Sequence, residues 1–566
     1  MSDEGGDARA RTRHWRPYVA TGLAFVALIL AVVFFDSRPL ADAARSQLWG
    51  LSALHYAEFD RKLPARQASG WYVGVGPGEL QPEAEAPDIH PVAGFYSGDV
   101  QVTVEKPDAQ DAVHCSVDGS IPTKRHPRYA GPLTLRKTTV VRCRTFRNGH
   151  QPSTAITRTF LLDAPGALPV LAMTVDPTNL WNKYTGIYAR FSERGHEWER
   201  DAAVEYFPRS ASPALAIPGR VRIHGFYSRS RPKKSFRFYY EPLPVEADDS
   251  ENIFTQSTAA DERVVVFGAR EAKVSRDELF QSIYAAAGGL ASDNMPVFMY
   301  LNGEPWGIYY VRERIDEEFL QRRVGPGAYD LLDAQPGKPR VIAGDRRHWD
   351  RTIEFFQNAD LSDPGAFAAA GELVDIDNFT DFWLFNIYAA NRDWPHHNMN
   401  MFRSRDGEDD RWRWIAWDAD ATFDFMGKGL QHDTLAWATR STLRHDLRLN
   451  NEAGLRDTED LRVSTLIVRK LLENDAYREK FARRMTELLE TRLTPDNVEE
   501  ALDTLHNEIA QDLAPDWKRW DLDGDGYDAE RVSYDEDLTR LRNFIHRRPA
   551  VIEELFRDAA SSVRSH

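Results

Sequence analysis

The chain has 566 residues, which is more than one hydrophobic core usually organises, so we expect two or three domains. Hydrophobic residues make up 42% of the chain and aromatic residues 11%, as is typical of folded proteins with large cores. The formal net charge of −16 argues against nucleic-acid binding, because phosphate recognition requires a basic surface.

A charge-free apolar segment lies near the N-terminus. Residues 18–35 read YVATGLAFVALILAVVFF, and at about 1.5 Å per residue a helix of this length nearly spans a hydrocarbon core of roughly 30 Å. Arginines cluster in residues 1–17, which predicts a cytoplasmic basic tail and a single-pass anchor in a bacterial membrane. The alternative is a cleaved signal peptide, since residues 41–43 (ADA) resemble a cleavage site. Both alternatives place the bulk of the chain outside the cytoplasm.

Residues 36–91 are predicted to form a linker or stalk, because Pro, Gly and acidic residues dominate its second half. Residues 92–164 change to short alternating segments separated by turn signals such as Asp118-Gly119, which predicts a small all-β sandwich. The segments FYSGDVQVTVE, CSVDGSIPT, RYAGPLTLRKTTVVRCRTF and NGHQPS resemble the C-terminal module of chitobiase-type hexosaminidases. This resemblance implies an accessory role, with polysaccharide as a candidate partner. Cys115 and Cys143 could form a disulfide or remain two buried thiols.

Residues 165–560 mix strands and helices. Strands are predicted at VRIHG, KKSFRFYY, RVVVFG, VFMYLN and GIYYVRER, with a hairpin turn at Asn302-Gly303. Helices are predicted at SRDELFQSIYAAAG and DNFTDFWLFNIYAA and over much of the C-terminal part. Because strands come first and helices afterwards, we expect an α+β fold with two lobes and a cleft between them.

Polar residues at the junction of the two halves could perform chemistry. Asp393 and Asn398 have the R-D-x-x-x-x-N spacing of a protein-kinase catalytic loop. Asp418 and Asp420 follow in WIAWDAD, and on an extended strand two residues spaced in this way share a face. Adjacent carboxylates repel each other unless a cation joins them, which favours a metal site. The alternative is structural, with Asp393 capping a helix and Asp418 paired with an arginine.

Five blocks in a fixed order carry a second resemblance, over roughly residues 168–555. They are NLWNKYTGIYARFSERGHEWERDAAVEYF, RVRIHGFYSRSRPKKSFRFYY, VFMYLNGEPWGIYYVRERID, DIDNFTDFWLFNIYAANRDWPHHN and WRWIAWDADATF. The chain resembles the CotH kinase family, the spore-coat-type atypical protein kinases. The resemblance implies an atypical protein-kinase-like domain that uses ATP and Mg²⁺.

The resemblance also implies a role for each matching residue. Asp393 would accept the proton of the substrate hydroxyl, and Asn398 and Asp418 would bind Mg²⁺. Asp420 would be an additional ligand or would take the place of Asp418.

The nucleotide-binding residues are expected on the preceding strands. Gly225, Ser228 and Arg229 would lie over the phosphates, and Lys234 would pair with them, with Lys233 as the competing lysine.

Two acidic positions remain open. Glu278 or Asp277 would orient the lysine, and Glu313 would stand where kinases place the segment that contacts adenine. The alternative for Glu313 is a salt bridge with Arg312 or Arg314.

Some features depart from ordinary protein kinases. The chain has no G-x-G-x-x-G loop and no D-F-G triplet. His396 and His397 lie inside the catalytic loop, but we do not expect zinc there, since adjacent histidines rarely share an ion and no third ligand is suitably spaced.

A separate acidic segment, DLDGDG, places Asp521, Asp523 and Asp525 as in a calcium loop. Val532 occupies the position of the usual bidentate glutamate, so a standard EF-hand is not expected. The alternatives are a nonstandard Ca²⁺ site and an acidic solvated turn.

The sequence therefore predicts a membrane-anchored kinase-like transferase that moves phosphate from ATP to Ser or Thr of a cell-envelope protein. Export from the cytoplasm normally separates a protein from ATP, so two alternatives remain. One is transfer of AMP or glutamate by the same fold. The other is a binding protein for envelope assembly.

Overall fold

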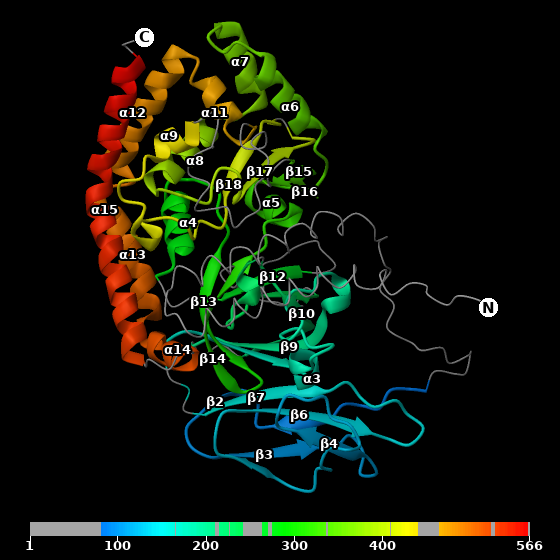
Figure 1. The fold of residues 1–566 in the computed structure, drawn as a ribbon. Coiled ribbons are helices and arrows are strands. Elements are labelled where there is room, and N and C mark those ends of the chain that lie inside the picture. The colour runs from blue at the N-terminus through cyan, green and yellow to red at the C-terminus, as the bar shows by residue number, and fades with distance from the viewer. Residues whose placement is uncertain are drawn as a thin grey trace, which may run out of the picture. The chain divides into compact units, whose positions relative to one another are not determined.

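The computed structural model describes residues 81–162, 164, 166–209, 214–225, 227–241, 263–269, 274–334, 338–407, 409–439, 463–521 and 527–563. These residues form a mixed α+β structure, as the sequence predicted (Figure 1). Along the chain, two small sheets come first, a barrel follows, and a helical part with one further sheet completes the fold. The apolar segment at residues 18–35 lies outside the described residues, and within the described part no helix is long and apolar enough to cross a bilayer.

The N-terminal described region consists of two facing sheets of short strands around one core. Val100–Glu105 alternates strictly between buried and exposed side chains, as expected for a strand with one face on a core. A disulfide joins Cys115 and Cys143 on neighbouring strands, so the two cysteines are paired and not free. One sheet has the order β1 (Asp88–His90), β3 (Val100–Glu105), β5 (Leu133–Leu135), and the other β2 (Gly94–Tyr96), β7 (Ile156–Leu162), β6 (Thr139–Phe146), β4 (Ala112–Ser116).

The next seven strands close into a barrel, which the sequence did not predict. Neighbouring strands are antiparallel except for β8 and β13, which run parallel and close the barrel. Aromatic side chains fill its interior, and Phe238 stacks on Phe267 with ring centroids 5.5 Å apart. The strand order is β10 (Leu215–Ile223), β11 (Phe236–Tyr240), β12 (Arg263–Ala269), β14 (Glu304–Glu313), β13 (Asn294–Leu301), β8 (Val170–Val175), β9 (Arg200–Phe207), and the short helix α3 (Pro177–Trp181) follows β8.

The hairpin predicted at Asn302-Gly303 joins β13 to β14. Both residues have positive φ, 53° and 81°, which is the backbone of a type I′ turn and suits Asn and Gly. Helix α4 (Arg276–Ala286) precedes β13 and contributes almost all of its side chains to the buried interior.

One further sheet, of four strands, begins the helical part. Its order is β16 (Arg340–Ala343), β15 (Tyr329–Asp333), β17 (Met399–Ser404), β18 (Arg413–Ala416). Helix α8 (Ile376–Tyr388) packs on this sheet, and its C-terminal half is buried. It begins where Asp375 caps the Asn378 amide at 3.1 Å.

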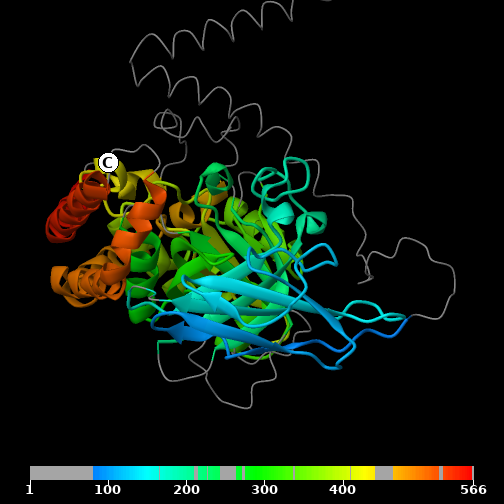
Figure 2. The same cartoon turned by 90° about the horizontal axis from the view of Figure 1, so that it is seen from below.

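Of the remaining helices, α9, α12 and α15 pack against α8. The C-terminal helices α12 and α13 both pack along the long helix α15 (Figures 1 and 2). The helices are α5 (Glu317–Arg323), α6 (Arg347–Asn358), α7 (Pro364–Leu373), α9 (Thr434–Thr439), α11 (Leu466–Leu471), α12 (Asp475–Thr491), α13 (Pro495–Ile509), α14 (Leu513–Trp520) and α15 (Tyr527–Val563).

Candidate active site

The loop between α8 and β17 brings Asp393 and Asn398 together. The side-chain amide of Asn398 donates a hydrogen bond of 3.1 Å to the Asp393 carboxylate. Asn398 has φ 55°, in the left-handed region that asparagine tolerates better than most residues. The five-residue spacing seen in the sequence therefore corresponds to a direct contact, and neither side chain is fully buried.

Buried neighbours hold this loop in place. Asn391 accepts a hydrogen bond of 3.1 Å from the backbone N–H of Asp393, and its own side chain donates to Asn386 of α8 at 2.8 Å. Trp394 is fully buried, and its ring centroid lies 4.5 Å from that of Trp383. The carbonyl of Trp394 accepts a hydrogen bond of 2.7 Å from the indole N–H of Trp437. The position of Asp393 is thus fixed from both sides.

Asp418 follows the end of β18 and adopts φ 52°. The pKa of Asp418 is raised to about 7. The first cause is desolvation of the carboxylate by surrounding protein, although the side chain keeps exposed surface. The second cause is repulsion by the charges of Asp277, Asp393 and Asp333. Arg312 acts in the opposite direction. Asp418 therefore lies in a cluster of carboxylates that includes Asp393.

Arg312 on β14 partly neutralises this cluster. Its guanidinium forms ion pairs with both acids at the start of α4, with Asp277 at 2.9 Å and also with Glu278. Asp277 in turn accepts a hydrogen bond of 2.8 Å from the backbone N–H of Ala419. Through this chain of contacts, α4 positions the backbone next to Asp418.

Two histidines complete the loop. His396 is 1% exposed, and burial, together with neighbouring His397, lowers its pKa to about 3, so the imidazole is neutral. The two rings lie with centroids 4.4 Å apart. Ligand atoms of Asp393, His396 and His397 all lie within 4.8 Å of one another. The sequence argument that no third ligand accompanies the histidines is therefore wrong, because that argument considered spacing only and not the curvature of the loop.

The residues expected over the phosphates form a compact turn after β10. Gly225 has φ 96°, and a Cβ there would lie 2.0 Å from the hydroxyl oxygen of Ser228. Arg229 is buried and donates to the carbonyls of Ile223 and Phe191, both at 2.6 Å, and also to that of Glu193. In this structure Arg229 thus holds the turn together.

Lys234 is buried beside this turn. Its ammonium donates to the carbonyls of Arg229 at 2.7 Å and Arg231 at 2.9 Å, and it lies 4.5 Å from the ring centroid of Phe191. Burial and the charge of Arg229 lower its pKa to about 8. The expected partnership between Lys234 and Glu278 is not seen among the described contacts, since Arg312 pairs with Glu278. Lys233, the competing lysine, pairs with Asp516.

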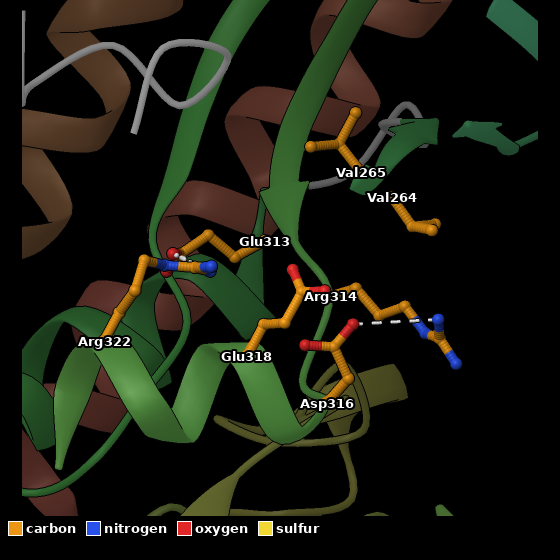
Figure 3. A pocket seen from close by; sticks show the side chains of 7 residues that line it. All are labelled: Val264, Val265, Glu313, Arg314, Asp316, Glu318 and Arg322. Atoms are coloured by element: carbon orange, nitrogen blue, oxygen red, sulfur yellow. Dashed lines mark hydrogen bonds and ion pairs between the residues drawn. The ribbon is translucent and has the colours of Figure 1, made fainter. Parts of the chain in front are cut away.

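Glu313 is buried at the end of β14 and forms ion pairs with Arg322 at 3.0 Å and Arg323 at 2.7 Å. These arginines belong to α5 and are not the neighbours Arg312 and Arg314 that the sequence suggested. Figure 3 shows Glu313 pointing toward Arg322 at the edge of a small polar pocket. The residues lining this pocket are Val264, Val265, Glu313, Arg314, Asp316, Glu318 and Arg322.

Comparison with protein families identifies the larger part of the chain. Residues 221–552 match the family model described as CotH kinase protein, which is more than half of the chain. The chain belongs to the CotH kinase family. Residues 91–158 match the chitobiase/beta-hexosaminidase C-terminal domain. The two matches confirm both resemblances seen in the sequence, with the hexosaminidase-type domain preceding the CotH domain along the chain.

Solved structures similar to this CotH-family chain include the proinflammatory kinase CtkA of Helicobacter pylori, at 11% identity and a TM-score of 0.19. That match covers 46% of this chain and 92% of CtkA. A toxin–antitoxin complex of HipA, HipB and operator DNA from Shewanella oneidensis MR-1 matches at 13% identity and a TM-score of 0.19, covering 50% of this chain and 60% of that one. Among curated proteins, no match was found.

Some residues of the candidate site were not found from the sequence. Arg312 was considered only as a partner of Glu313, and Asp333 was not considered. Asp333 ends β15 and repels the charge of Asp418. Arg312 and Asp277 are separated by 35 positions in the chain, so no local pattern connects them. The one available signal was the pair of acids at the start of a helix, which requires a cation nearby when buried.

The other predicted ligands have different outcomes. Asp420 is exposed, and because the strand ends at Ala416 and the backbone turns at Asp418, the expected shared face with Asp418 does not exist. Of the predicted calcium ligands, Asp521 follows α14, whereas Asp523 and Asp525 lie outside the described residues.

Proposed function

We propose that this CotH-family chain is an ATP- and Mg²⁺-dependent transferase that moves phosphate to a Ser or Thr hydroxyl of a cell-envelope protein. The observation that carries the proposal is the contact of Asp393 with Asn398, near enough to Asp418 for the charge of Asp393 to act on it. In this assignment Asp393 orients the hydroxyl and accepts its proton.

The donor set fits magnesium. Mg²⁺ prefers oxygen ligands, which the carboxylate of Asp418 and the amide oxygen of Asn398 supply. Asn398 donates its N–H to Asp393, so its carbonyl oxygen is oriented away from that bond and is available to a cation. Burial first, and then repulsion by neighbouring carboxylates, raises the pKa of Asp418, and a divalent cation would relieve that repulsion. When bound, Mg²⁺ would neutralise charge on the phosphates during transfer.

The location outside the cytoplasm is part of the same proposal. Residues 18–35 would anchor the chain in a bacterial membrane, and the disulfide between Cys115 and Cys143 is typical of proteins from oxidising compartments. The sandwich would lie near envelope polysaccharide, in keeping with the hexosaminidase-type domain that it matches.

A transfer assay tests the proposal. The purified full chain is incubated with γ-labelled ATP, Mg²⁺ and an envelope protein extract, and the label on protein is counted. We expect Asp393→Ala and Asp418→Asn each to lower the rate by about 10²–10⁴-fold, because they remove the proton acceptor and a metal ligand. Asp558→Asn, on the exposed face of α15, should retain the wild-type rate.

The mass added to the target separates the related activities, since phosphate, AMP and glutamate differ in mass. Label transfer that survives both substitutions would overturn the assignment of the site. Addition of AMP or glutamate, abolished by the same substitutions, would retain the site and correct the product.

A further inference from the structure

We infer that the catalytic loop holds a second kind of metal site, in which Asp393, His396 and His397 bind one Zn²⁺ ion. This site differs from the proposed Mg²⁺ site in using two imidazoles. Among the described residues, it is the one group of three or more His, Cys, Asp or Glu side chains whose ligand atoms lie within 4.8 Å of one another.

His396 provides an independent observation. It is 1% exposed, and neither of its ring nitrogens has a hydrogen-bond partner. A neutral imidazole carries one donor and one acceptor, and buried polar atoms in folded proteins nearly always find partners. Because the ring lies in the cluster with Asp393 and His397, a metal ion there would satisfy one of the nitrogens.

Other histidines in the described part of the chain do have partners. The ring of His348 accepts a hydrogen bond of 3.0 Å from the indole N–H of Trp412. The rings of His432 and His506 form hydrogen bonds with the hydroxyls of Thr434, at 2.8 Å, and Tyr534, at 3.0 Å. These three histidines are only partly buried, whereas His396 is fully buried and still has no hydrogen-bond partner.

The loop conformation explains how adjacent histidines can share an ion. In a strand, neighbouring side chains point to opposite faces. His396 and His397 lie instead in the irregular segment between α8 and β17, and their ring centroids are 4.4 Å apart. Zinc bonds of about 2.0–2.2 Å place tetrahedral ligands roughly 3.3 Å apart, so small side-chain rotations would close the site.

The donor set favours Zn²⁺ over Mg²⁺. Two imidazoles and one carboxylate suit Zn²⁺, which takes three protein ligands and leaves a fourth position open, whereas Mg²⁺ prefers oxygen ligands throughout. Bound zinc would occupy the carboxylate of Asp393 and prevent it from accepting a proton. Zinc inhibition of transfer therefore rests on the proposed function, but zinc binding does not.

Metal binding to the full chain, purified with a histidine-free tag and treated with chelator, tests the inference without ATP. Calorimetric titration with ZnCl₂ should give one site per chain, and Co²⁺ should produce the visible absorption of a four-coordinate ion. His397→Gln and His396→Gln should each weaken Zn²⁺ binding by at least about 100-fold, because each removes a direct ligand, whereas losing an outer partner costs roughly 10–100-fold. Excess Mg²⁺ should not displace the ion.

The matched control is His546→Gln, which replaces an exposed histidine on α15 and should leave the affinity unchanged. The less buried His397 keeps the test decisive if His396→Gln does not fold, which circular dichroism would show. Absence of a zinc site in the wild-type chain, or a site that persists in His397→Gln, would overturn the inference. Neither result would affect label transfer in a buffer that contains Mg²⁺ and no zinc. That transfer assay tests the proposed function separately.

Discussion

Glu205 on β9 is an acid buried where the sandwich meets the barrel. Its carboxylate is 2% exposed and accepts a hydrogen bond of 2.5 Å from the hydroxyl of Thr159 on β7. Burial raises the pKa of Glu205 to about 7, and the hydrogen bonds from Thr159 and the charge of Arg158 only partly oppose that shift. The folded chain therefore binds this proton more tightly than the unfolded chain does.

This shift predicts a pH dependence. Because the pKa is raised on folding, the stabilisation is complete below the unfolded value near 4.5 and is lost as pH rises through about 7. Between pH 5 and 8 the wild-type chain should lose up to about 3 kcal/mol relative to Glu205→Gln, measured by urea unfolding at several pH values. Glu500→Gln, exposed on α13, should keep the wild-type profile; equal profiles for Glu205→Gln and wild type would contradict the prediction.

At the residue scale, sequence reasoning succeeded where the interacting groups are close in the chain. Asp393 and Asn398 lie in one short loop, so their spacing in the sequence indicated that their side chains would be close, and the two are hydrogen-bonded. It did not find Arg312, whose partners lie on another element. It also expected Glu278 or Asp277 to orient Lys234, although in the structure the ammonium is bound by nearby carbonyls.

Among the elements, α4 and β14 are joined by the ion pairs of Arg312. Strands and helices of this region follow from periodicity, and the Asn-Gly hairpin follows from turn chemistry. Closure of the barrel could not be predicted, because it depends on the parallel pairing of β8 with β13, which are separated by more than 100 residues. The turn at Asp418 was missed because alternation predicts a strand but not where it ends.

Arg312→Met should destabilise the chain strongly. It would leave Asp277 and Glu278, 5% and 3% exposed at their side chains, without their cation. Breaking a buried ion pair by removing one partner costs about 3–5 kcal/mol. Urea unfolding of the full chain measures this loss, and Arg405→Met, at a more exposed ion pair, should cost less than about 1 kcal/mol. A loss below 1 kcal/mol for Arg312→Met would show that Arg312 does not hold α4 in place.

At the scale of the whole molecule, the order of the two families was foreseen and is confirmed, because several separated blocks must agree for such a match. The membrane anchor stays a prediction, since residues 18–35 lie outside the described part of the chain. The candidate site takes its groups from α4, β14, β15, the segment after β18 and the loop after α8. We propose that in this site Asp418 and Asn398 bind the metal of ATP·Mg²⁺.

Calorimetric titration of the full chain with a non-hydrolysable ATP analogue, with and without Mg²⁺, tests this claim most directly. We expect Mg²⁺ to increase the affinity at least about tenfold in the wild-type chain, because the carboxylate cluster repels the bare triphosphate. Asp418→Asn should abolish the increase, and Asp558→Asn should keep it. Equal affinities with and without Mg²⁺ in the wild-type chain, or an undiminished increase in Asp418→Asn, would contradict the account.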